Sequence, residues 1–171
     1  MQRTARGGFT ILELMIVVGV VAVLAAIAIP NFLRYQARSK TSEVKTNLAA
    51  LRVAEDAYFA EHNVHAPAAA EPALIPGSRA AVFDAEGSDF ATVGWAPEGR
   101  VYFSYAVVVS ADGSGFTADA GGDVDGDGIV SLWGYAKPDG AFVVQNGSIG
   151  CDVSFLAPQQ VGRCGVDESV F

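Results

Sequence analysis

Basic residues are scarce in this sequence. Lys and Arg number 11 in 171 residues against 19 Asp and Glu, which gives a formal net charge of −8 and a pI near 4.6. A protein that binds nucleic acid needs a basic surface to neutralise phosphates, so this balance argues against nucleic acid as a partner. The length fits one domain with a modest core, plus an apolar N-terminal segment.

Catalytic motifs are missing as well. The Ser, Asp and His residues form no recognisable nucleophile motif, and no glycine-rich phosphate loop is present. We therefore predict that the chain is not an enzyme. His62 and His65 have no third metal ligand near them in the sequence, so we expect exposed loop histidines rather than a metal site.

Cysteine is limited to one pair, Cys151 and Cys164, near the C-terminus. In an exported chain this pair is most simply a disulfide, which would add roughly 3 kcal/mol of stability on the chain-entropy model. In a cytosolic chain the same residues would be two reduced thiols. Whether the chain is exported must therefore be judged from its N-terminal sequence.

The N-terminus carries a long apolar run with one acid in it. From Leu14 to Ile29 every residue is apolar or Gly, and the run from Phe9 is long enough to span a bilayer as a helix. A plain membrane anchor, with Glu13 reaching the headgroups, remains open, as does a signal peptide cut near residues 26–28. A buried core helix is unfavourable for so long and uniformly apolar a segment.

The order of residues around Glu13 favours a further interpretation. The basic leader "MQRTARGG" ends at Gly8, Phe9 follows, and Glu13 is the fifth residue counted from Phe9. This arrangement, and nearly all of "GFTILELMIVVGVVAVLAAIAIPNF", resembles the class III signal of type IV pilins and the related pseudopilins. The resemblance implies a membrane aspartyl peptidase that removes residues 1–8 by cutting between Gly8 and Phe9, and that methylates the new N-terminus to give N-methylphenylalanine at position 9.

Elementary electrostatics gives Glu13 a role beside this resemblance. Cleavage would create a cationic amine at Phe9, and a lone ammonium or carboxylate in an apolar bundle is unfavourable. Both charges are stabilised if Glu13 of one subunit lies beside the Phe9 amine of its neighbour. The pair would also fix the axial register between apolar helices. We therefore predict that Phe9 and Glu13 are the assembly residues.

Residues 9–30 and 31–62 are expected to form the two halves of one helix. Pro30 removes a backbone donor and, with Gly19, marks the expected kink; Pro30 also matches the position where pilin helices bend. After Pro30, apolar residues recur at helical spacing at Val44, Leu48, Leu51 and Tyr58, which predicts an amphipathic helix ending near His62.

The remainder predicts a small antiparallel head. Residues 63–100 are rich in Ala, Pro and Gly and are expected to be a long connecting loop in which a short helix or strand can form. Strands are predicted in "VYFSYAVVVS", "GFTADAG", "IVSLWGYAK" and "AFVVQ", within a head of residues 101–171 that includes the Cys151–Cys164 loop. The predicted class is α+β, with a long N-terminal helix packed on a small antiparallel sheet, as in the pilin fold. Residues 94–128 also resemble the heads of delta-proteobacterial pilins.

An acidic loop, "DVDGDGIVSLW", follows the second predicted strand. Alternating carboxylates before a Gly suit a hard cation such as Ca²⁺, and at least one of these acids should have a raised pKa when no cation is bound. The twelfth position of an EF-hand loop needs Glu and is Gly134 here, so the loop is not an EF-hand. A solvated acidic turn is the alternative. The candidate ligands are Asp119, Asp123, Asp125, Asp127, the Ile129 carbonyl and the Ser131 hydroxyl.

Together these features predict a structural subunit of a type IV pilus. The resemblance implies partners: other copies of the chain, a prepilin peptidase, and an assembly platform and secretin. It also implies a single-pass precursor in the inner membrane with its head in the periplasm, and an extracellular pilus after assembly. Motility, adhesion and DNA uptake are roles of that family. Two alternatives remain: a pseudopilin of a type II secretion system, and a membrane-tethered calcium-binding or adhesive domain that does not polymerise.

Overall fold

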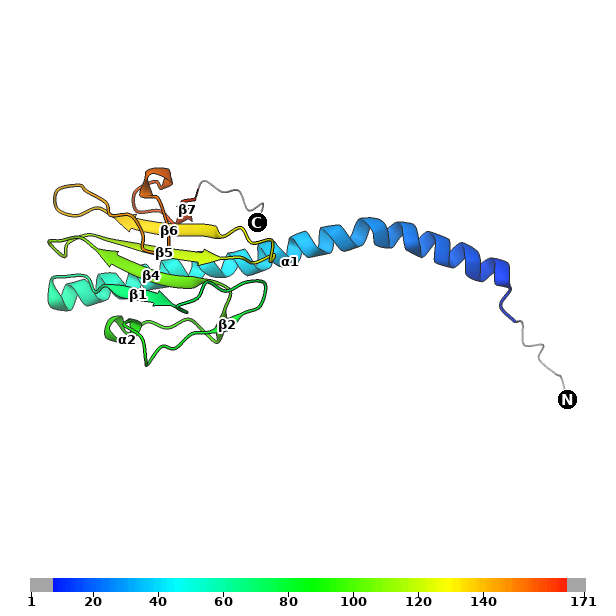
Figure 1. Cartoon of the computed structure of the whole chain (residues 1–171), viewed down its shortest axis with the longest axis horizontal. Coiled ribbons are helices and arrows are strands. Elements are labelled where there is room, and N and C mark those ends of the chain that lie inside the picture. The colour runs from blue at the N-terminus through cyan, green and yellow to red at the C-terminus, as the bar shows by residue number, and fades with distance from the viewer. Residues whose placement is uncertain (1–7, 166–171) are drawn as a thin grey trace. The chain divides into compact units, whose positions relative to one another are not determined.

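The computed structural model describes residues 8–165 and divides the chain into two compact units, Met1–Gln36 and Ala37–Phe171. The elements in chain order are α1 (Ile11–His62), β1 (Ala68–Glu71), β2 (Ala81–Val82), α2 (Phe90–Val93), β3 (Arg100–Val101), β4 (Ser104–Val109), β5 (Phe116–Gly122), β6 (Ser131–Lys137), the 3-10 helix η1 (Val153–Phe155) and β7 (Gly162–Arg163) (Figure 1). The predicted α+β class, one long N-terminal helix with an antiparallel sheet, is confirmed.

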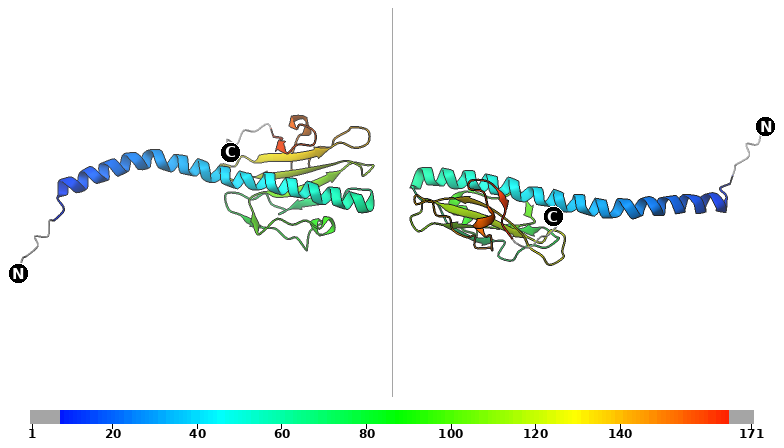
Figure 2. Two further views of the ribbon diagram at one scale, coloured as in Figure 1. Left: turned by 180° about the vertical axis from the view of Figure 1, so that it is seen from behind. Right: turned by 90° about the horizontal axis from the view of Figure 1, so that it is seen from above.

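In the second unit α1 lies against one face of the sheet, as the views in Figure 2 show. Its buried stripe keeps a spacing of three and four residues, which places all members on one face. Val44, Leu48 and Leu51 are each fully buried. Burying an aliphatic side chain of this size stabilises a fold by roughly 1.5–3 kcal/mol. The stripe consists of Ala37, Thr41, Val44, Leu48, Leu51 and Glu55.

Helix α1 ends where the sequence predicts. Asn63 has a positive φ of 58°, and its N–H donates to the Phe59 carbonyl at 2.8 Å. A residue in the left-handed region at this position is a common helix stop, and Asn accepts that conformation more readily than most residues. The chain then returns along the head, where the His65 N–H donates to the Gly113 carbonyl at 2.9 Å.

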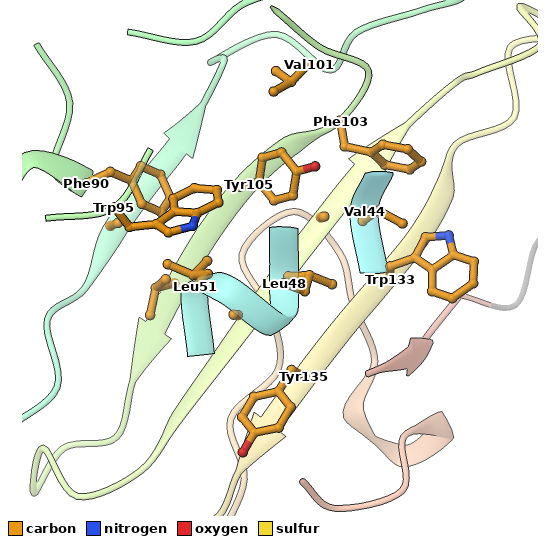
Figure 3. Close-up of a cluster of buried hydrophobic side chains, with 14 of the residues drawn as sticks. Val44, Leu48, Leu51, Phe90, Trp95, Val101, Phe103, Tyr105, Trp133 and Tyr135 are labelled. Carbon is orange, nitrogen blue, oxygen red and sulfur yellow. The ribbon is translucent and has the colours of Figure 1, made fainter. Parts of the chain in front are cut away.

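The main sheet has the order β1-β4-β5-β6-β7, and every neighbouring pair is antiparallel. Tyr105 of β4 lies opposite Ala120 of β5, which in turn lies opposite Trp133 of β6. Tyr105, Trp133 and Tyr135 gather around the α1 stripe in Figure 3. Small residues between large aromatic ones leave room for the helix. The core therefore lies between α1 and one face of this sheet.

Two expectations about the head differ from the structure. Residues 63–100 do more than connect: β1 forms an edge of the main sheet, and β2 and α2 lie in the same segment. The fourth predicted strand, "AFVVQ" at residues 141–145, is wrong. The Asp139 side chain accepts hydrogen bonds from the Ala141 and Val143 N–H groups. These N–H groups are bonded within a turn and therefore cannot pair with a neighbouring strand. On the side of β6 that does not pair with β5, the neighbouring strand is β7.

Candidate functional site

The start of α1 is closed by a reciprocal cap between Thr10 and Glu13. The Glu13 N–H donates to Thr10 Oγ1 at 3.2 Å, and the Thr10 N–H donates to Glu13 Oε2 at 2.9 Å. The Thr10 hydroxyl also donates to Glu13 Oε2 at 2.7 Å. This is a capping box, which satisfies N–H groups that a helix start leaves without partners. Sequence reasoning missed it, although Thr-x-x-Glu before an apolar run is its signature.

The cap also orients the Glu13 carboxylate. Both Thr10 donors reach Oε2, and no donor among residues 8–165 reaches Oε1. A carboxylate offers about four lone-pair sites, so capping uses only part of its capacity. Glu13 and Phe9 are both exposed, the latter at 75%. The structure therefore keeps the two predicted assembly residues accessible to other molecules.

The apolar surface behind this cap has no partner within the described residues. The helix is long and apolar enough to cross a membrane, and none of its most apolar window is buried inside the protein. An apolar surface of this extent marks a membrane or protein contact. Its exposed members are Ile11, Leu12, Leu14, Met15, Ile16, Val17, Val18, Val20, Val21, Val23, Leu24, Ile27 and Ile29.

Both predicted kink residues lie inside α1. The helix runs through Gly19 and Pro30 without a break in its assignment. Pro30 has no N–H for the carbonyl four residues earlier, and the Asn31 side chain donates to the Ile27 carbonyl at 3.1 Å in the same turn. A bend at either residue stays a prediction.

Glu43 connects α1 to the sheet through hydrogen bonds. Its Oε1 accepts from the Tyr102 N–H at 3.1 Å and from the Tyr105 hydroxyl at 3.2 Å, and Asn47 donates to the same hydroxyl at 2.8 Å. Burial raises the pKa of Glu43, although the hydrogen bonds from Tyr102 and Tyr105 act in the opposite direction. Burial, then the Glu43 charge, also raises the pKa of Tyr105. A network of this kind fixes how the helix seats on the strands.

A second buried polar contact joins the other end of α1 to the head. Glu55 Oε2 lies 3.3 Å from His65 Nδ1 and accepts from the Ala66 N–H at 3.2 Å. His65 is buried between Phe59 and Phe116, so the expectation of an exposed loop histidine is wrong for this residue. His62 is exposed as expected, although it is the last residue of α1 and not part of a loop. Sequence spacing could not reveal the contact, because the chain turns back between its two members.

The acidic loop brings together only part of the predicted calcium set. Asp123, Asp125 and Asp127 can place one oxygen each within 4.8 Å of one another. Asp123 already accepts from the Gly126 and Gly128 N–H groups. Burial, followed by repulsion from Asp127, raises the pKa of Asp125, as the sequence predicts for such a cluster.

Asp119 is not part of that group of acids, whereas Ser131 lies in the strand that follows the acidic loop. Ser131 is buried in β6, opposite Gly122. Asp119 is buried in β5, where its Oδ2 accepts from the Ile149 N–H at 2.7 Å. Burial raises the pKa of Asp119 to about 6, although the N–H groups of residues 148–151 lower it. Asp119 thus holds the C-terminal loop and is not grouped with the three loop aspartates.

The loop held by Asp119 carries the predicted disulfide. Cys151 and Cys164 are bonded and both are buried, which confirms the pairing. Gly147 lies so close to Asp119 that any side chain at position 147 would overlap the carboxylate. The disulfide and the buried acid therefore attach one loop to the sheet at two points.

Comparison with known protein families finds a match at the N-terminus of the chain. The model of the prokaryotic N-terminal methylation motif matches residues 3–29. Of these, residues 3–7 belong to the predicted leader and lie outside the described residues, as do the other leader residues before Gly8. No solved structure matches the chain.

Several curated proteins are similar to part of the chain. The type IV major pilin protein PilA of Myxococcus xanthus is 54% identical over 69 residues, which are 40% of this chain and 31% of that protein. The type IV major alpha-pilin of Moraxella bovis is 46% identical over 57 residues (33% and 36%). The type IV major fimbrial protein FimA of Dichelobacter nodosus is 46% identical over 53 residues (31% and 34%). The chain thus spans about a third of these relatives, and its resemblance to type IV pilins, carried by the N-terminal methylation motif, is confirmed.

Proposed function

We propose that this chain is a structural subunit of a type IV pilus. The observation that supports this most is an apolar helical surface with no partner in the described chain, directly behind a processing motif. The similar proteins are named major pilins and fimbrial proteins, which fits a structural role. The described residues contain one group of acids that could hold a metal ion, Asp123, Asp125 and Asp127.

Processing is the first step of the proposal. A peptidase removes residues 1–8 by cutting between Gly8 and Phe9, and the new amine is methylated. Both residues are exposed in the described structure, so a membrane enzyme would have access to the bond. The cut also turns Phe9 into a cationic terminus only four residues before Glu13.

Pairing between subunits is the second step. Glu13 of one subunit accepts from the Phe9 amine of the next, through the oxygen that the Thr10 cap leaves available. Each charge would otherwise be left alone among apolar side chains, which is strongly unfavourable. Since the remaining contacts between such helices are nondirectional, this pair would set their axial register.

The resemblance to type IV pilins indicates where the protein is located before and after assembly, and with which partners. Before assembly the precursor is a single-pass inner-membrane protein with its head in the periplasm, and after assembly it is part of an extracellular pilus. Its partners are other copies of itself, the prepilin peptidase, and an assembly platform and secretin. The exposed apolar helix supports the membrane stage and a later exchange of lipid for other helices.

The proposal includes a bound calcium ion at the acidic loop. The carboxylates of Asp123, Asp125 and Asp127 converge, and like charges this close favour a bound cation. Calcium takes six to eight oxygen ligands, so backbone carbonyls such as that of Ile129, and water, would have to complete the shell. Asp119 accepts from the Ile149 N–H instead and leaves the proposed set, while the Ser131 hydroxyl stays a predicted ligand.

Intact-mass analysis of a sheared surface fraction tests the proposal. We expect long filaments whose subunit lacks residues 1–8 and carries one added methyl group. A Gly8→Leu variant is the matched control, and it should keep the leader and form no filament. A chain that starts at Met1 or at Ile29 would contradict the proposal. Correct processing without long surface filaments would instead favour the pseudopilin alternative.

A further inference from the structure

An aromatic side chain projects from the head at the end of β6. Phe142 is 89% exposed, and its φ of 64° lies in the left-handed region. Large side chains rarely adopt that conformation, and a fully exposed Phe contributes nothing to the core of its own chain. The sequence suggested a strand here, yet the structure places Phe142 at the tip of a turn.

Hydrogen bonds hold this turn in one conformation. Asp139 Oδ1 accepts from the Ala141 N–H at 2.9 Å and from the Val143 N–H at 2.8 Å, while the Phe142 N–H donates to the Asp139 carbonyl at 3.0 Å. The Gly140 N–H donates to Ser114 Oγ at 2.8 Å, which joins the turn to the β4–β5 hairpin. A contact residue that is already ordered loses little conformational entropy on binding.

A pocket of about 350 Å³ lies at the other end of β6. Its lining is mainly apolar, and Gly150 at its wall has a φ of 125°, a conformation that disfavours any side chain that would fill the space. An apolar cavity of about 150 Å³ is enough to bind benzene, so a phenyl ring fits the volume. The pocket is lined by Gly128, Ile129, Val130, Leu132, Gly150, Asp152, Cys164 and Gly165.

The turn and the pocket belong to opposite ends of the same strand. Val130 immediately precedes β6 and Leu132 is its second residue, whereas Phe142 lies five residues after its last residue, Lys137. Figure 1 shows the loop after β6 at one end of the sheet and the acidic loop before β6 at the other. Seven residues of strand separate the two features by about 20 Å. A Phe142 side chain therefore cannot reach the pocket of its own chain.

We propose that Phe142 of one copy inserts into this pocket of a second copy. The two surfaces differ, so the contact is head-to-tail, and each copy that accepts a ring presents another ring to the next copy. Heterologous contacts of this kind extend into open fibres unless they close into a ring. The inference rests on the proposed filament and adds a contact between heads to the contact between helices.

The area that this contact can bury limits which copies of the chain can form it. An aromatic side chain buries about 150–250 Å², whereas a stable interface buries at least about 1,200 Å². Phe142 alone therefore cannot hold a dimer in solution. Its partner is a copy already held by another interface, and the exposed apolar surface of α1 offers the area for one. We expect the contact in filaments and not between dispersed chains.

Photo-crosslinking of the full chain tests this contact. A benzophenone amino acid is placed at position 142, and sheared filaments are irradiated and mapped by mass spectrometry. We expect a crosslinked dimer whose second peptide lies within residues 128–132 or 150–152. The matched control is the same probe at Val53, which is 59% exposed on α1 and belongs neither to the turn nor to the pocket lining. It should give no crosslink to these peptides.

A pair of substitutions measures the strength of the contact. Phe142→Ala should lower filament recovery by about tenfold or more, as expected for an aromatic anchor, while Phe142→Leu should retain most of it. Filaments that form normally with no crosslink in the pocket would overturn this inference and leave the pilus proposal intact. Occupation of the pocket by residues 166–171 or by another protein would also give filaments without this crosslink, and it would overturn the inference in the same way. Absence of filaments from the unmodified chain would overturn both.

Discussion

The two ends of helix α1 place their glutamates in opposite surroundings. Glu13 is exposed and its Oε1 has no donor among residues 8–165, whereas Glu55 is fully buried and contacts His65 of the same chain. The apolar residues around them differ in the same way, since those near Glu13 are exposed and Leu51 beside Glu55 is buried. One segment has its partners within the chain, and the other needs partners outside it.

The largest effect is expected from Glu13→Ala. Removing one member of a charge pair in an apolar environment leaves the other unpaired, which costs about 3–5 kcal/mol. We therefore expect filament recovery to fall by at least about a hundredfold, with leader removal unchanged. Quantitative immunoblots of sheared and whole-cell fractions measure both.

A capping variant separates the two roles of Glu13. Thr10→Val removes the N-cap hydroxyl but keeps the carboxylate, so it should cost only about 1 kcal/mol of helix stability. Filament recovery should then fall far less than for Glu13→Ala. Equal losses for the two variants would mean that Glu13 acts through the cap and not through a neighbouring subunit.

The buried glutamate is expected to matter for stability and not for assembly chemistry. Glu55→Ala leaves His65 Nδ1 and the Ala66 N–H without an acceptor in a buried site, and we expect a loss of about 3 kcal/mol. Urea unfolding of the full chain in detergent measures it. The double variant Glu55→Leu/His65→Phe should recover part of the loss, because the unpaired imidazole is removed while the Ala66 N–H still lacks an acceptor. A loss within 0.5 kcal/mol, on the order expected for a surface site, would contradict the prediction.

Asp119 is expected to make the head more stable in mild acid. Its pKa of about 6 is raised above the ordinary value of 3.8, so protonation is favoured in the folded state. Its contribution is fully present below pH 4 and is lost as the pH rises through about 6. A shift of this size corresponds to roughly 3 kcal/mol.

The matched variant for this pH dependence is Asp119→Asn, which keeps an oxygen for the Ile149 N–H but does not titrate. Stability measured from pH 4 to pH 7 should fall for the parent chain relative to the variant. Parallel curves for the two proteins would show that Asp119 does not titrate in this range.

The smallest effect is expected from calcium. A ligand that binds only the folded chain stabilises it by about 2.7 kcal/mol at a hundredfold excess over Kd, and by less for a weak three-carboxylate site. We expect Ca²⁺ to raise the melting temperature by a few degrees at most. Chelation by EGTA should reverse the shift, and Asp125→Asn should remove it. An equal shift in Asp125→Asn would point to a nonspecific ion effect.

Sequence patterns located elements whose partners are close in the chain or uniform in character. The stripe Val44, Leu48 and Leu51 predicted one buried helical face, and Asn63 marked its end. The Cys pair was likewise confirmed. These features follow from local spacing, which a single sequence contains.

Contacts between distant residues could not be predicted in this way. His65 was expected on the surface because nothing nearby in the sequence shows that Glu55 and Phe116 enclose it. Asp119 was assigned to the acidic loop because it lies only four positions before Asp123, although in the structure its carboxylate accepts from N–H groups of residues 148–151 instead. In both cases the chain's return path determines the environment of the side chain.

The edges of the main sheet bear on whether neighbouring copies of the chain can aggregate through their strands. β1 has four residues, an irregular register with β4, and prolines at Pro67 and Pro72 on either side, while β7 has only two residues. Short, irregular or proline-flanked outer strands offer little template for a foreign strand. Crowding many copies side by side therefore carries a low risk of cross-β aggregation.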